Sequence, residues 1–123
     1  MLNKSLTFVE LFENAVSPDL IRACIKIYML KAKFETKNKR YKEALTIYKK
    51  CMAMFKREIS LIFNFNYIEK SSMARHNSKV KASVTTLIII IMNKVKIYEY
   101  FEKITKVIEL TQLGYWFLRK FIS

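Results

Sequence analysis

Residues 41–59 read YKEALTIYKKCMAMFKREI and carry the most regular hydrophobic pattern in the chain. Apolar side chains recur there at intervals of three and four residues, which is the spacing of one face of an α-helix. These positions are Tyr41, Ala44, Leu45, Tyr48, Cys51, Met52, Phe55 and Ile59. The pattern predicts an amphipathic helix over residues 41–62.

A second helix is expected directly before this one. Ser17 can cap a helix, Pro18 suits the first helical position, and Asp19 meets the positive end of the helix dipole. Helical spacing continues through Leu20, Cys24, Ile27, Tyr28 and Phe34, so we expect a helix over residues 18–37. The polar residues 36–40, TKNKR, indicate a short turn. Two helices joined by such a turn predict an antiparallel helical hairpin.

The second half of the chain predicts another hairpin. Residues 64–73 break the pattern with polar side chains, and a helix is expected over residues 74–93. The β-branched run at residues 84–92 also suits a buried strand. Helix is favoured because the sequence holds no second strand-like segment with which a strand would pair.

The chain ends on an amphipathic pattern and an aromatic segment. The spacing of the apolar residues predicts a helix over residues 95–112, and Gly114 is expected to end it in the left-handed conformation. Residues 115–123 then form a short aromatic tail, which we expect to fold back as a cap or to dock on a partner. Residues 6–16 are expected to form a short packing helix.

Composition bounds the fold and the chemistry. A chain of 123 residues, 52% of them hydrophobic, predicts a single all-α domain over residues 1–123, built as a small bundle of antiparallel helical hairpins. Two Cys and one His argue against a disulfide scaffold and a zinc site, and one Gly argues against a phosphate-binding loop. We therefore expect no enzyme, no metal and no cofactor.

Residues 28–59 carry a pattern of small and aromatic residues. Ala32 and Ala44 are small enough to let two helices approach closely, while bulky side chains wedge above and below them. The full set is Ala32, Tyr41, Ala44, Tyr48, Cys51 and Phe55. In this pattern the segment resembles a tetratricopeptide-type hairpin, and equally the three-helix microtubule-interacting-and-trafficking domain. The resemblance implies stacked helical hairpins and a peptide-binding role.

Charge points to an anionic partner. Lys and Arg number 23 against 10 Asp and Glu, for a net charge of +13. An excess of this size favours nucleic acid, an acidic protein segment or an anionic membrane, although AT-rich coding sequence would produce the same bias. Lys42, Lys49 and Lys56 lie seven residues apart along one flank of the apolar stripe of residues 41–59, and Lys50 and Arg57 lie on the far side.

Three functions remain open at this point. The leading hypothesis is a protein-interaction or scaffold module that binds an acidic or amphipathic segment. The alternatives are an RNA- or DNA-associated subunit of a ribonucleoprotein held by phosphate contacts, and peripheral association with anionic membranes through Trp116 and Phe117. The sequence shows no secretory signal or membrane-spanning segment, so an intracellular location is expected.

Overall fold

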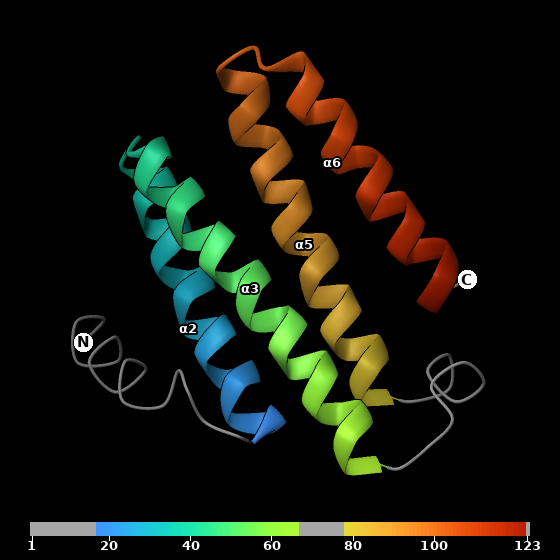
Figure 1. Cartoon of the computed structure of the whole chain (residues 1–123). Coiled ribbons are helices and arrows are strands. Elements are labelled where there is room, and N and C mark those ends of the chain that lie inside the picture. The colour runs from blue at the N-terminus through green and yellow to red at the C-terminus, as the bar shows by residue number, and fades with distance from the viewer. Residues whose placement is uncertain (1–16, 67–77, 123) are drawn as a thin grey trace. The chain divides into compact units, whose positions relative to one another are not determined.

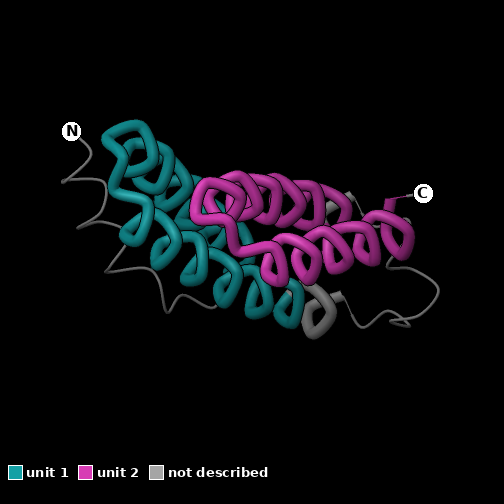
Figure 2. Tube along the Cα trace, turned by 90° about the horizontal axis from the view of Figure 1, so that it is seen from above, with its two compact units in different colours: residues 1–65 teal, residues 66–123 magenta. Residues whose placement is uncertain are grey.

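The structure, a computed structural model, describes residues 17–66 and 78–122. The chain divides into two compact units, residues 1–65 and residues 66–123 (Figure 2). The described residues form helices and short turns with no strand among them, which confirms the all-α class. The expected packing helix over residues 6–16 lies outside the described residues.

Unit 1 is a hairpin of α2 (Pro18–Lys37) and α3 (Tyr41–Asn66), as the sequence predicts, with α3 running past the predicted end (Figure 1). Polar contacts link the two helices in antiparallel register. Arg22 Nη1 lies 3.8 Å from Glu58 Oε2, and the Cys51 thiol lies 3.9 Å from the Ile25 carbonyl oxygen.

This register places Ala32 level with Ala44. In an antiparallel pair the residue numbers of facing positions have a nearly constant sum, and Ile25 with Cys51 sets that sum for this hairpin. Ala32 and Ala44 share it, and both are fully buried at 0% exposure. The two small residues therefore lie in the core of unit 1 at the same level, where they allow close helix packing.

The turn after α2 is a Schellman motif without glycine. The Arg40 amide donates to the Glu35 carbonyl at 2.8 Å, and the Lys39 amide donates to the Thr36 carbonyl at 3.0 Å. Lys39 has a φ of 62°, the left-handed conformation that this motif requires. At the start of α2, Ser17 has the extended backbone of an N-cap but makes no side-chain capping hydrogen bond, contrary to expectation.

Unit 2 contains α5 (Ser78–Tyr100), α6 (Ile104–Phe117) and a π-helical segment, η1 (Leu118–Ile122). α5 packs along both α6 and η1 (Figure 1). The expectation of helix over strand for residues 84–92 is confirmed. Residues 67–77, where the predicted connection ends and the predicted helix over 74–93 begins, lie outside the described residues.

The predicted bounds of the last two helices are wrong. α5 continues through the expected break at residues 93–95, and the turn lies at residues 101–103. It is a second Schellman motif: the Lys103 amide donates to the Tyr98 carbonyl at 2.9 Å, and Glu102 has a φ of 58°. Because a glutamate occupies the left-handed position, the usual glycine signal is missing from the sequence.

Gly114 does not end a helix. It lies inside α6 with a φ that is not positive, so the predicted left-handed terminator is wrong. The expected tail at residues 115–123 is helical as far as Ile122, continuing α6 into η1 without a reversal. A terminating glycine is needed only where the chain reverses direction. Here the chain after Gly114 continues along α5 through the end of α6 and η1, so no reversal occurs.

Candidate functional site

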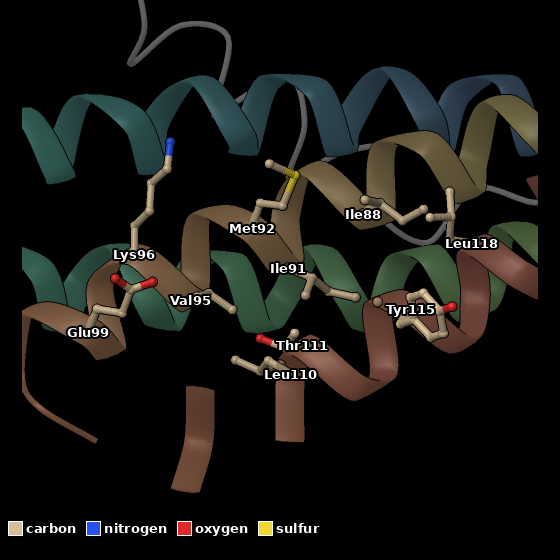
Figure 3. A pocket seen from close by; sticks show the side chains of 11 residues that line it. Ile88, Ile91, Met92, Val95, Lys96, Glu99, Leu110, Thr111, Tyr115 and Leu118 are labelled. Atoms are coloured by element: carbon tan, nitrogen blue, oxygen red, sulfur yellow. The ribbon is translucent and has the colours of Figure 1, made fainter. Parts of the chain in front are cut away.

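An open apolar groove runs between α5 and α6 in unit 2, with a volume of about 380 Å³. Figure 3 shows its lining from both helices, with Lys96 and Glu99 at one end and Tyr115 and Leu118 at the other. The lining residues are Ile88, Ile91, Met92, Val95, Lys96, Glu99, Leu110, Thr111, Gly114, Tyr115 and Leu118.

Gly114 is the smallest of the residues that line the groove. Gly114 has no side chain, and a Cβ atom built there would lie 3.4 Å from Ile91 Cγ2. α6 therefore approaches α5 closely near its C-terminal end, where even a methyl group would be in van der Waals contact with Ile91. The lining is mostly apolar, and its polar side chains are Lys96 and Glu99 at one end with Thr111 and Tyr115 on α6.

The rim of the groove leaves large apolar side chains in water. The exposed fractions are 54% for Met92, 61% for Tyr115 and 40% for Leu118. Contiguous exposed apolar surface of this kind is typical of a binding site for a protein, a lipid or another apolar ligand. The groove was not predicted from the sequence, because a helix end at Gly114 would have removed one of its walls.

Trp116 and Phe117, predicted from sequence as partner contacts, do not line this groove. They belong to an aromatic cluster on α6 and η1, where their ring centroids lie 4.8 Å apart and Phe117 stacks on Phe121 at 6.1 Å. Trp116 is about half exposed, and the Lys120 ammonium lies 4.8 Å from its ring centroid. Phe117 is less accessible than Trp116, so Trp116 offers more contact surface.

The predicted lysine row is present on α3. Lys42, Lys49 and Lys56 are all exposed, on the side of the helix away from the buried positions. Lys50 is also exposed, but its ammonium lies 4.8 Å from the Tyr28 ring centroid, and Arg57 is half-buried. The row of three is therefore the most accessible part of the predicted basic set.

Two carboxylates of unit 1 are withdrawn from its surface. Glu35 and Glu58 are each 3% exposed. Glu35 is held by Lys31 Nζ at 2.9 Å and by Arg40 Nε at 2.8 Å. Over residues 17–66 the chain has twelve Lys and Arg against four Asp and Glu, so this unit keeps a strong excess of positive charge although three of its cations pair with these two carboxylates.

The remaining hairpin residues serve packing. Tyr48, Cys51 and Phe55 are buried, and Tyr41 is half-buried at the start of α3. Burial raises the pKa of the Cys51 thiol to about 12, so the thiol stays protonated and unreactive at neutral pH. Across the two described ranges, no three His, Cys, Asp or Glu side chains gather in a way that would hold a metal ion.

Two residues of the apolar pattern that predicted α2 lie at the surface of unit 1. Leu20 is 38% exposed and Phe34 is 47% exposed, whereas Cys24 and Tyr28 from the same predicted stripe are buried. Apolar residues occupy more than half of the circumference of α2, so its buried stripe and its exposed stripe lie side by side. Helical spacing alone does not separate the two stripes.

Within the described segments, no helix has the length and apolar character needed to cross a bilayer. Comparison with known proteins finds no matching family model, no matching curated protein and no matching solved structure.

Proposed function

We propose that this protein is an interaction module that binds an amphipathic helical segment of a partner protein in the groove between α5 and α6. The observation that carries the proposal is the open apolar groove, whose rim residues Met92, Tyr115 and Leu118 are exposed. Closing this surface against a partner helix removes apolar area from water, which is the main driving force of association.

The spacing of the lining residues favours a helix as the ligand. On α5 they include Ile88, Met92, Val95 and Glu99, at intervals of four, three and four residues. Residues at these intervals lie on one face of α5, where the side chains of a third helix can pack between them as in a coiled coil. From Ile88 to Glu99 the wall spans about 16 Å at about 1.5 Å per residue, which is enough for roughly three turns of a bound helix.

Charge favours an acidic outer face on that helix. Over residues 78–122 the chain has eight Lys and Arg against three Glu, and Lys96 lies on the groove itself. A partner with apolar residues on one face and carboxylates on the other satisfies both features. The resemblance of residues 28–59 to a tetratricopeptide hairpin supports an interaction role and is part of this proposal.

A designed peptide tests the proposal directly. The probe is a fluorescent peptide of about 18 residues with leucines at helical spacing and glutamates elsewhere, and its scrambled sequence is the negative control. Met92→Gln combined with Leu118→Gln should weaken binding at least about tenfold, since both changes remove apolar contact area.

Ile89→Gln combined with Ile108→Gln is the matched control. These residues are 42% and 51% exposed on the same two helices but do not line the groove. The control should bind the peptide as the wild type does. Equal affinity for the scrambled peptide, or equal losses in both double variants, would show that the groove is not the binding site.

The lysine row on α3 supports a second candidate, binding of single-stranded nucleic acid. Seven residues of helix rise about 10 Å, which is close to three base steps of about 3.4 Å along a strand. Lys42, Lys49 and Lys56 therefore have a repeat that suits every third phosphate of a strand. Changing all three to Gln should lower affinity for a homopolymeric RNA and flatten its salt dependence by about 0.7 for each phosphate that is no longer neutralised. An unchanged salt slope would remove this candidate.

A further inference from the structure

The helix α2 carries a second apolar stripe that faces away from its own core. It consists of Leu20, Ala23, Ile27, Leu30 and Phe34, at alternating intervals of three and four residues. Leu30 is 60% exposed, the highest fraction among the large apolar residues of this helix, and Phe34 is 47% exposed. From Leu20 to Phe34 the stripe is about 21 Å long.

Lysines border this stripe on both sides. Lys26, Lys33 and Lys37 are exposed along one edge, at positions that lie beside the stripe on a helix with about 3.6 residues per turn. On the other edge, the Lys31 ammonium lies 5.2 Å from the centroid of the Phe34 ring and forms an ion pair with the buried Glu35 carboxylate at 2.9 Å, so the free cationic charge lies on the edge of Lys26, Lys33 and Lys37. The arrangement is an apolar strip with a row of exposed lysines along one edge, which is a pattern found in helices that lie in the interface of an anionic membrane.

We propose that the outer face of α2 docks on an anionic membrane surface, with the apolar stripe at the headgroup boundary and the bordering lysines against lipid phosphates. The lysine stems are long enough to leave their ammonium groups at the headgroups while the apolar side chains enter the interface. This inference concerns unit 1 and does not depend on the peptide groove of unit 2.

Charge and shape favour a membrane over other partners. A second copy of the chain would bring two lysine-bordered faces together, and their like charges would repel. A partner helix would contact a single convex helix along one row of side chains, whereas a lipid interface accepts the whole width of the stripe. An anionic bilayer therefore matches both the charge and the exposed shape of this face.

The test measures binding of the full chain to vesicles by co-sedimentation. The vesicles contain phosphatidylcholine, with or without about a third phosphatidylserine. We expect binding to the anionic vesicles that falls steeply between low and high salt, and little binding to the neutral ones. Leu30→Gln combined with Phe34→Gln should reduce the partition coefficient at least about tenfold by removing the apolar anchors.

The lysines provide a matched pair of triple variants with the same change in net charge. Changing Lys26, Lys33 and Lys37 to Gln should reduce binding to anionic vesicles strongly, by about tenfold or more. Changing the α3 row of Lys42, Lys49 and Lys56 to Gln should have a much smaller effect. Equal losses in the two triple variants would show attraction by overall charge and would overturn the assignment to α2.

A local probe separates insertion from adsorption. A Phe34→Trp, Trp116→Phe variant places the single tryptophan of the chain within the stripe. Its emission should shift to the blue on anionic vesicles and should be quenched by brominated lipids. Absence of both changes, or binding of the acidic peptide at this tryptophan with no binding to vesicles, would refute the membrane assignment. Thermal melting of each variant confirms that it remains folded.

Discussion

Replacing Gly114 with alanine should stabilise the protein, although this is its single glycine. The residue lies within α6 at a φ that alanine adopts freely, so the change recovers the helix propensity that glycine lacks, about 1 kcal/mol. The new Cβ would meet Ile91 Cγ2 at 3.4 Å, which is van der Waals contact at its near limit. We expect a net gain of about 0.5–1 kcal/mol in the free energy of unfolding.

Urea denaturation measures this gain as a higher midpoint at unchanged slope, and thermal melting should rise by about 3–5 °C. Thr111→Ala is the matched control. Thr111 is exposed on the same helix, so its replacement gives the effect of propensity without the Ile91 contact. A loss of stability in Gly114→Ala, with a gain in Thr111→Ala, would mean that α5 and α6 approach too closely at Gly114 for a methyl group to fit.

Three further changes test the hairpins and the buried thiol. Ala44→Leu should cost about 1–3 kcal/mol by overpacking the core of unit 1, measured by urea denaturation, and unchanged stability would show that the two helices are not in close contact at Ala44. Lys39→Gly and Glu102→Gly should each raise the melting temperature, because glycine removes a left-handed strain of about 1 kcal/mol from each Schellman turn. The pKa of Cys51 rises from 9.0 to about 12 on folding. Its contribution to stability is therefore complete below pH 9 and is lost between pH 9 and about pH 12, as the unfolded thiol ionises first. Cys51→Ala should lack this component of the alkaline loss, as measured by urea midpoints across that range.

The hairpin of unit 1 could be predicted from sequence because its signals are local and agree. Pro18 marks the start of α2, and the polar run before Tyr41 marks the turn, so the bounds of α2 match the structure at both ends. The core pattern of α3 is equally regular, with Ala44, Tyr48 and Cys51 all buried. Propensity, patterning and turn chemistry support the same structure there.

The second hairpin was harder to predict because its turn has no glycine and its single glycine is not in a turn. Asn93 resembles a break in the pattern, but the chain remains helical through it and turns at Glu102, where backbone hydrogen bonds close a Schellman turn with a glutamate in the left-handed conformation. Gly114 resembles a terminator but instead lies within α6, where it approaches Ile91 closely and lines the groove. The groove itself depends on the pairing of two helices, which periodicity within one helix does not encode.

The exposed apolar residues of α2 also show that periodicity within one helix does not reveal which apolar positions a neighbouring helix buries. Periodicity finds apolar positions, but the number of stripes that a helix buries depends on how many neighbours it has. α2 holds enough apolar residues for two stripes, and the core residues Cys24 and Tyr28 occupy one of them. Leu30 and Phe34 remain in water beside lysines, an arrangement that weakens solubility unless a partner covers it. Under the two proposals, the groove of unit 2 and the outer face of α2 bind different ligands, one a helix and one a charged interface. A protein that binds both would hold its helical partner at an anionic membrane. Because the two surfaces lie on separate compact units, the groove variant Met92→Gln, Leu118→Gln should retain vesicle binding, and the stripe variant Leu30→Gln, Phe34→Gln should retain peptide binding.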